Sequence, residues 1–144
     1  MALDIGTFRV NVDTEVNGFW HEVSGAKLCI ARVGNPVYKR LVRERLADHI
    51  RKRLTEEQID QILGTILGEC ILIGWENLQE NGKELPYSKG DAVRLMTSQE
   101  YHDFRDIVVF LAEKEEFYRA DYVERTKKKS QSGSDGDAPS PTKQ

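Results

Sequence analysis

The spacing of apolar positions changes along the chain, and each change predicts a different element. Between Phe19 and Val33, two short runs of β-favouring residues flank Ser24-Gly25-Ala26. This pattern predicts a β-hairpin with a loop of about three residues. After Gly34 the apolar residues recur every three or four positions instead, as they do along one face of a helix.

A first helix is predicted over residues 36–53. Asn35 can cap its start, and Pro36 suits the first turn, where the missing N–H has no helical partner to lose. Val42 and Leu46 belong to its apolar stripe, and its other face is basic.

A second helix is predicted over residues 56–73, because Thr55 and Gln58 have the spacing of a capping box. It is the most apolar segment and is expected to be the central core helix. Gly64 and Gly68 are unusual inside it, since each costs about 1 kcal/mol relative to alanine. They predict the close approach of another helix, more readily from this domain than from a partner. If the helix came from a partner, Gly64 and Gly68 would be the partner-binding residues.

The segment "GWENLQENGKELPYS", residues 74–88, is called the connector below. We expect Trp75 to be largely buried where the second helix ends. Asn81-Gly82 predicts a tight turn. The residue before Pro86 must be extended, because proline excludes helical angles there.

Two further helices are predicted after the connector. Ser88 starts a short helix that reaches about Met96, and Thr97 with Glu100 has the spacing of a second capping box. The last helix is expected to run from there to about Thr126.

From Lys127 onward the sequence "KKKSQSGSDGDAPSPTKQ" has no large apolar residue and is expected to be disordered. The predicted fold class is therefore mainly α (α+β). It has an N-terminal β-hairpin, a compact bundle of about four helices and a disordered C-terminal tail. The predicted domains are residues 1–126 and the tail, 127–144.

Composition narrows the classes of protein that this chain can belong to. Its 144 residues can form a core without a metal or disulfide. Cys29 and Cys70 stand among apolar neighbours and are expected to be buried free thiols. No apolar run approaches the roughly 20 residues that span a bilayer, and no signal peptide is apparent, so we expect a soluble intracellular protein.

Charge is distributed unevenly although the net charge is only −3. Residues 1–54 carry +4, residues 55–126 carry −9 and residues 127–144 carry +2. Opposed basic and acidic faces can steer a charged partner, and they also serve simply to keep a protein soluble.

Signatures of catalysis are absent from the sequence. It has neither a glycine-rich phosphate loop nor a nucleophile elbow. The acidic run from Glu113 to Glu116 is typical of a solvated helix face. The histidines fall on three different elements without an adjacent acidic cluster: His21, His49 and His102. We therefore predict no enzyme activity, no catalytic residue, no cofactor and no metal site.

Nucleic-acid binding is the harder alternative to dismiss. The basic helix "KRLVRERLADHIRKRL" precedes a second helix, as in a helix-turn-helix. The second helix would read the bases, yet it is acidic at its start and apolar along its length. Nucleic-acid binding is therefore disfavoured.

Three motifs in order resemble the tail assembly chaperones of long-tailed bacteriophages. Residues 71–96 are similar to the family's apolar helix ending in a tryptophan, its Gly-Lys-x-hydrophobic-Pro-Tyr-Ser connector and its helix with Ala-x-x-Leu. Residues 30–46 resemble its strand, Gly-Asn-Pro-x-Tyr break and first helix. Residues 104–118 resemble its closing helix. The resemblance spans about residues 18–118.

This resemblance implies a non-catalytic protein that binds the tape measure protein and helps tail tube protein polymerise around it. Such chaperones act in the host cytoplasm and are not retained in the virion. The motif positions are expected to be structural: Asn35, Pro36, Trp75, Gly82, Pro86 and Tyr87. The alternatives are a structural head–tail or tail component and, less favoured, a helix-turn-helix regulator. Self-association is left open.

The resemblance also implies a frameshift-extended form, through which tail tube protein would be recruited. Lys127, Lys128 and Lys129 need codons made only of A and G, which can match a slippery site. This position is expected to follow the last helix. Without the resemblance, the lysines are better explained as favourable charges at a helix C-terminus.

Overall fold

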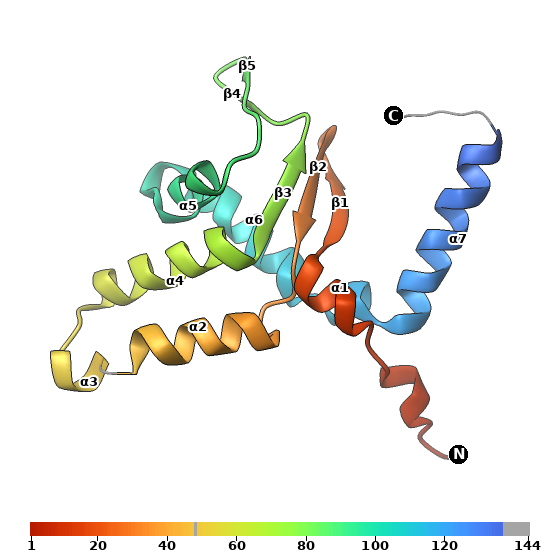
Figure 1. Ribbon diagram of the computed structural model, residues 1–144, viewed down its shortest axis with the longest axis horizontal. Helices are drawn as coiled ribbons and strands as arrows, with labels where there is room; N and C mark the ends of the chain where they lie inside the picture. Colours follow the sequence, from red (N-terminus) through yellow and green to blue (C-terminus); the bar gives the residue numbers. More distant parts are fainter. Residues whose placement is uncertain (48, 137–144) are drawn as a thin grey trace.

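The computed structural model describes residues 1–47 and 49–136, and its centre is a three-stranded antiparallel sheet with helices packed against one face (Figure 1). The chain begins with η1 (Ile5–Phe8), α1 (Val12–Asn17), β1 (Phe19–Val23), β2 (Ala26–Ile30), α2 (Pro36–Leu46) and α3 (His49–Lys52). It continues with α4 (Glu56–Cys70), β3 (Leu72–Glu76), β4 (Gln79–Glu80), β5 (Lys83–Glu84) and α5 (Lys89–Thr97). It ends with η2 (Gln99–Tyr101), α6 (His102–Glu113), η3 (Glu115–Tyr118) and α7 (Ala120–Gly136). The mixed α+β class and the N-terminal hairpin are confirmed.

The β1–β2 hairpin turns through two residues and not three. Ser24 and Gly25 have φ values of 51° and 90°. Two consecutive positive φ values are what a type I′ turn requires, and its twist matches the strands on either side. The register pairs Phe19 with Ile30 and Val23 with Ala26.

The connector begins in a strand and not at a helix end, which corrects the second helix predicted to continue to residue 73. Helix α4 stops at Cys70, and β3 pairs with β2 so that Trp75 lies opposite Leu28. Short apolar runs do not distinguish a helix from a buried strand, and this one is rich in the residues that strands favour. The third strand matters because a two-stranded hairpin alone is marginally stable.

The predicted first helix is divided. Helix α2 ends at Leu46 and the short α3 follows, ending before Arg53, whose φ is 53°. The start is as predicted: the Asn35 side chain accepts hydrogen bonds from the backbone N–H groups of Val37 and Tyr38. Figure 1 shows α2 lying beside α4, with α3 at the far end of the pair.

The predicted last helix is broken into four pieces, and the capping box at Thr97 does not form. Thr97 is instead the last residue of α5, and its hydroxyl donates to the Val93 carbonyl. Lys114 and Arg119 are extended, which lets the chain change direction on either side of η3. Tyr118 thereby turns into the core, fully buried, and its hydroxyl donates to the Ile30 carbonyl over 2.9 Å.

Helix α7 continues past the boundary predicted at residue 126. Its backbone is helical to Gly136, while residues 137–144 lie outside the described part of the chain. Lysine and arginine have good helix propensity, so a polar segment can extend a helix without a core to bury. Lys127, Lys128 and Lys129 therefore fall inside α7 and not after the last helix.

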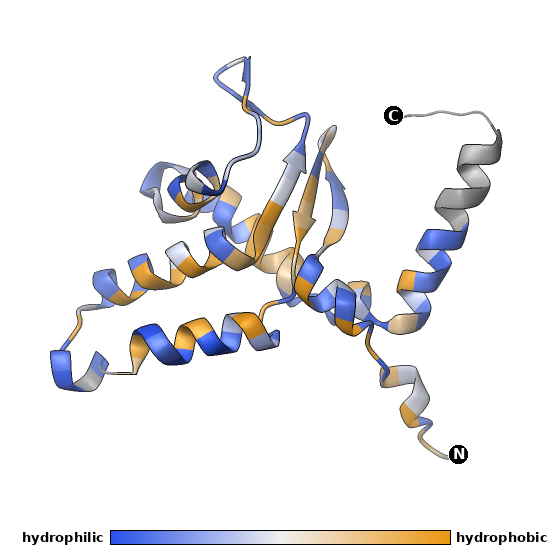
Figure 2. Cartoon of the chain, viewed as in Figure 1, coloured by the Kyte–Doolittle hydropathy of each residue, from blue (hydrophilic) through white to orange (hydrophobic). Residues whose placement is uncertain are grey.

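The core lies between the inner face of the sheet and helices α4, α5 and α6. Figure 2 shows apolar residues concentrated along the strands and the sides of the helices that meet them. Its fully or nearly fully buried members include Leu28, Ile30, Ile71, Leu72 and Met96.

Gly64 and Gly68 bring α4 and α5 into backbone contact. A Cβ added at Gly64 would lie 2.5 Å from the Met96 carbonyl oxygen, and one at Gly68 would overlap the Val93 backbone. The close helix approach predicted from these glycines is therefore made within this chain. Because α5 covers both positions, they are not available to a partner in this structure.

Trp75, in strand β3, holds the later part of the connector against the sheet through contacts with Leu85 and Tyr87. It is 5% exposed, and its indole N–H donates to the Leu85 carbonyl over 2.7 Å. The ring of Tyr87 meets it edge to face with 4.7 Å between centroids. The burial predicted for Trp75 is confirmed, although the residue stands in β3.

His21 is a buried polar residue in an aromatic setting. It is 6% exposed, its ring meets Phe117 edge to face, and no hydrogen-bond partner for Nε2 is present among the described residues. Burial lowers the pKa of His21 from 6.5 to about 4. The neutral imidazole is therefore the form that the fold accommodates.

Trp75→Ala should lower the free energy of unfolding by about 3–5 kcal/mol, because it opens a cavity in the core. Trp75→Phe should lose about 1 kcal/mol, chiefly the hydrogen bond to Leu85. Trp20→Ala is the matched control, since Trp20 is 48% exposed and should cost less than half as much. Urea unfolding followed by circular dichroism measures all three. Equal losses at Trp75 and Trp20 would contradict the assigned role of Trp75.

Gly64→Ala and Gly68→Ala should each destabilise the protein by about 1–3 kcal/mol, because the added methyl group displaces α5. Gly90→Ala is the control within α5. A Cβ there meets nothing within 4 Å, so alanine should stabilise the helix by up to about 1 kcal/mol. Thermal melts of the three variants test this contrast. Stabilisation at all three positions would show that α4 and α5 do not touch at the glycines.

Stability should fall as the pH is lowered from 6.5 to 4, because the unfolded chain binds a proton on His21 that the folded chain does not. The loss is about 1.4 kcal/mol per pH unit, reaching about 3 kcal/mol below pH 4. His21→Phe should remove this component and keep the aromatic packing. Urea unfolding of both proteins at several pH values gives the difference. Parallel pH profiles would contradict the assignment to His21.

Candidate functional site

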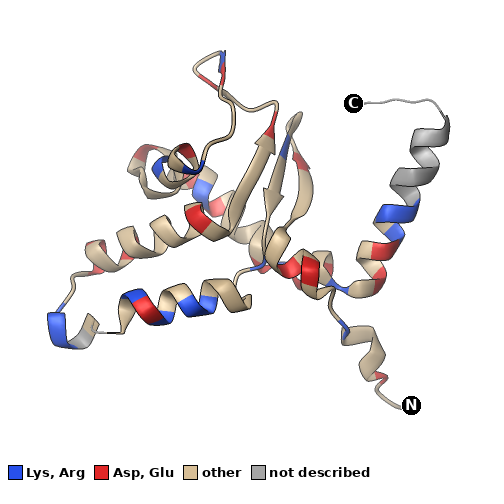
Figure 3. Cartoon of the chain, viewed as in Figure 1, with Lys and Arg blue, Asp and Glu red and all other residues tan. Residues whose placement is uncertain are grey.

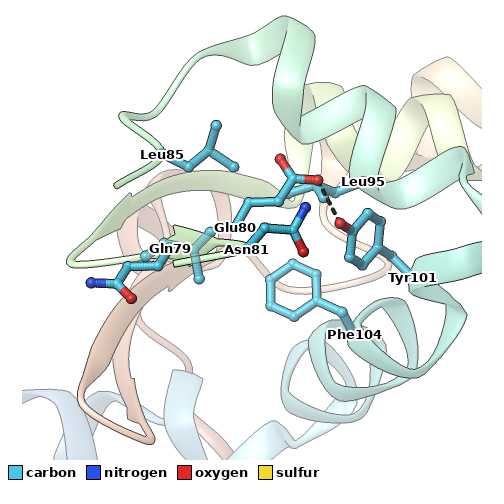
Figure 4. A pocket seen from close by; sticks show the side chains of 8 residues that line it. Gln79, Glu80, Asn81, Leu85, Leu95, Tyr101 and Phe104 are labelled. Carbon is cyan, nitrogen blue, oxygen red and sulfur yellow. Dashed lines mark hydrogen bonds between the residues drawn. The ribbon is translucent and has the colours of Figure 1, made fainter. Parts of the chain in front are cut away.

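The connector borders an open apolar groove, which we call the connector groove. It consists of two hollows, of about 200 Å³ and 420 Å³. The first is lined by Leu78, Gln79, Glu80, Asn81, Leu85, Leu95, Tyr101 and Phe104 (Figure 4). The second is lined by Val23, Ser24, Ala26, Leu28, Asn77, Leu78, Gln79 and Phe104. Because Leu78, Gln79 and Phe104 line both, the hollows adjoin.

A tight hairpin in the connector forms one wall of the groove. Asn81 and Gly82 have φ values of 53° and 82°, so the turn predicted there is confirmed as the two-residue β4–β5 turn. The Leu85 N–H donates to the Leu78 carbonyl over 2.8 Å and closes the loop. Pro86 follows on the surface and is exposed.

The carboxylate of Glu80, which lines the groove, is paired with Arg94 and Tyr101. Arg94 donates two hydrogen bonds to the Glu80 carboxylate, of 2.9 and 3.1 Å, and the Tyr101 hydroxyl donates a third (Figure 4). The hydrogen bonds from Arg94 lower the pKa of Glu80 most, and the hydrogen bond from Tyr101 lowers it further. The same contacts raise the pKa of Arg94 and of Tyr101. The groove thus presents apolar side chains and neutral amides, and its carboxylate is already paired.

Helix α6 extends the apolar surface beyond the groove. Ile107 and Phe110 follow Phe104 at three-residue spacing, which places neighbouring side chains on the same side of a helix. They are 41% and 58% exposed. Exposed apolar side chains therefore continue from Phe104 of the groove along α6 to Ile107 and Phe110.

Titratable side chains elsewhere do not form a buried reactive site among the described residues. Burial raises the pKa of the Cys29 and Cys70 thiols to about 11, so both stay protonated and are poor nucleophiles. Both are free thiols, as expected.

An acidic neighbourhood for His102 corrects one expectation from the sequence. His102, Asp103 and Asp106 place one ligand atom each within 4.8 Å of the others. The His102 and Asp103 side chains are 70% and 91% exposed. All three residues are exposed to water, so the cluster lacks the buried, oriented ligands of a formed metal site.

The motif residues hold the chain in place. Asn35 is buried as the N-cap of α2, with Pro36 as the first residue of that helix. Tyr87 donates a long hydrogen bond of 3.4 Å to the Leu72 carbonyl while it packs on Trp75. These contacts agree with the structural roles expected of Asn35, Pro36, Trp75 and Tyr87.

Sequence reasoning missed the residues that line the groove from other elements. Tyr101 and Phe104 fall within the last predicted helix and Leu78 within the connector, and the sequence predicts none of the three to line a site. Nothing local marks them as neighbours of the connector. Tyr101 and Glu80, for example, form a hydrogen bond although they are 21 residues apart in the chain.

The basic surface has a geometry unlike that of a DNA-reading helix pair. Figure 3 shows Lys and Arg gathered on α2 and α3. The second helix of the pair, α4, is held between α2 and α5 and buries Gly64, Ile66, Leu67 and Gly68. Its exposed start carries Glu56 and Glu57, which repel phosphates.

Among the described helices, none combines the length and apolarity needed to cross a bilayer.

Comparison with known proteins places the chain in a prophage family. The model of the family described as YdaY prophage protein matches residues 33–129, about two thirds of the chain. No curated protein and no solved structure matches it. The chain belongs to the YdaY prophage protein family and is phage-derived.

Proposed function

From its membership of a prophage family, we propose that the protein is a non-catalytic tail assembly chaperone whose connector groove binds an apolar segment of the tape measure protein. The groove carries this proposal. It is built from the same connector that resembles those of tail assembly chaperones, and its one carboxylate is paired with Arg94 and Tyr101.

The chemistry of the groove suits a protein chain better than a small charged ligand. An anion would meet Glu80, and a cation would compete with the two hydrogen bonds from Arg94. An apolar side chain needs neither and gains from leaving water. The exposed Ile107 and Phe110 would lengthen the contact along α6, as binding of a helical segment requires.

The alternative roles have less support. A structural head–tail or tail component would also bind proteins, but it would remain in purified particles. A DNA-binding regulator would use the basic α2 and α3. The recognition helix would then be α4, but α4 is packed against α5 and in this arrangement is unable to enter a groove of DNA. The frameshift-extended form and its binding of tail tube protein stay predictions. They now concern a position inside α7.

Gln79→Arg should weaken binding of the tape measure protein at least tenfold, because it places a long charged side chain where the two hollows meet. The hairpin should tolerate it, since Gln79 pairs with Glu84 across the strands and opposite charges there are favourable. The measurement is co-expression with the tape measure protein of the same prophage, followed by co-purification and quantification of its soluble fraction.

Glu124→Gln is the matched control, because it makes the same change in net charge on the exposed surface of α7. It should bind as the unchanged protein does. Equal binding by Gln79→Arg and Glu124→Gln would refute the groove as the binding site. A tape measure protein that neither co-purifies nor gains solubility with the unchanged chain would refute the chaperone function itself.

A further inference from the structure

The exposed side of helix α6 combines apolar and acidic side chains. Phe110 lies near the middle of that side, with Asp106 and Ile107 one turn before it and Glu113 one turn after it. Asp103, a further turn towards the start of the helix, belongs to the same side. All five residues are exposed to water. Two large apolar side chains are thus bordered by three carboxylates.

The carboxylates on this side of α6 are not neutralised within the chain. Among the side chains that the structure describes, none forms an ion pair or a hydrogen bond with Asp106 or Glu113. The carboxylate of Asp103 lies 3.1 Å from Nδ1 of His102, and this contact is an ion pair only when the histidine is protonated.

Charges elsewhere around the proposed binding surface are paired inside the protein. Arg94 donates two hydrogen bonds to the carboxylate of the connector groove. Arg105, on the other side of α6, donates hydrogen bonds of 3.0 and 3.1 Å to Asp60. Lys114 lies over Phe110, with Nζ 4.6 Å from the ring centroid, and so packs on the ring and not against a carboxylate. The carboxylates of α6 can therefore pair with cations that a partner brings.

The mixture of apolar and unpaired acidic side chains restricts the chemistry of a partner. Covering Ile107 and Phe110 removes apolar surface from water and favours binding. The same cover takes water away from Asp106 and Glu113, and a carboxylate that loses water without gaining a partner opposes binding. Lysine or arginine side chains, one turn before and after an apolar residue of a partner helix, would replace that water.

We propose that the exposed side of α6 binds a basic amphipathic helix. Its apolar side chains would cover Ile107 and Phe110, and its lysines or arginines would pair with the carboxylates of α6. Two apolar side chains offer little area, so the charges serve mainly to speed association and to reject acidic segments. The identification of this helix as part of the tape measure protein rests on the proposed function, whereas the preference of α6 for a basic helix does not.

Two designed peptides test the preference in fluorescence anisotropy with the purified full chain. One is an amphipathic peptide of leucine, alanine and lysine, about 18 residues long so that it can form a helix. The other has glutamate in place of each lysine. The unchanged protein should bind the lysine peptide at least tenfold more tightly, and added salt should weaken this binding by screening the charges. Equal binding of the two peptides would overturn the proposal.

Asp106→Asn combined with Glu113→Gln should weaken binding of the lysine peptide about tenfold, because both unpaired carboxylates are lost. Glu56→Gln combined with Glu57→Gln is the matched control. It makes the same change in net charge at two exposed residues of α4, and it should bind nearly as the unchanged protein does. Equal losses in the two double variants would show that net charge alone attracts the peptide, which would overturn the assignment to α6.

Phe110→Ala should also weaken binding of the lysine peptide about tenfold. Trp20→Ala is its control, since Trp20 is another exposed aromatic residue, on β1, and should bind the peptide unchanged. Both side chains are about half exposed, so circular dichroism should show both variants folded. Undiminished binding by Phe110→Ala would refute the apolar part of the contact.

Co-purification of the tape measure protein with the same variants separates this inference from the proposed function. Loss of binding in both Gln79→Arg and the α6 double variant would support both. Loss in Gln79→Arg alone would leave the chaperone function standing and overturn α6 as part of its binding surface. Binding of the lysine peptide without any binding of the tape measure protein would refute the function and support the preference of α6.

Discussion

The backbone contact between α4 and α5 is the constraint on which the rest of the structure depends. Gly64 and Gly68 lack the side chains that would hold the helices apart, so α5 lies directly on α4 at Met96 and Val93. Two glycines inside a helix weaken it by about 2 kcal/mol in propensity. Packing at native density offsets that cost, because every atom of the contact gains close neighbours.

The position of α5 decides the position of the connector. The chain leaves β3, makes the β4–β5 turn and must reach Ser88, which caps α5. Trp75 and Tyr87 hold the two ends of this path together over the sheet. Leu95 of α5 then forms part of the groove, with Arg94 beside it pairing Glu80. The groove is thus a consequence of how closely two helices approach.

A binding role for this surface is consistent with what surrounds it. Its carboxylate is neutralised, its amides are neutral and its apolar strip continues along α6. Proteins that assemble phage particles must hold other chains without changing them chemically. Membership of a prophage family and an apolar groove of this kind support such a role.

The sequence by itself determined the local features: the presence of the N-terminal hairpin, the caps at Asn35, Thr55 and Ser88, the turn at Asn81-Gly82, the burial of Trp75 and the close approach at the α4 glycines. Each depends on a few neighbouring residues, so spacing and residue type are enough to predict it. Only the tertiary structure decided that residues 72–76 form a strand, that the last helix breaks at Lys114 and Arg119, and that Tyr101 and Phe104 meet the connector. A short apolar run is compatible with either a helix or a strand, and the choice is made only when a neighbouring strand forms hydrogen bonds with its backbone. A groove that is lined from separate segments of the chain has no local sequence pattern by which it could be predicted.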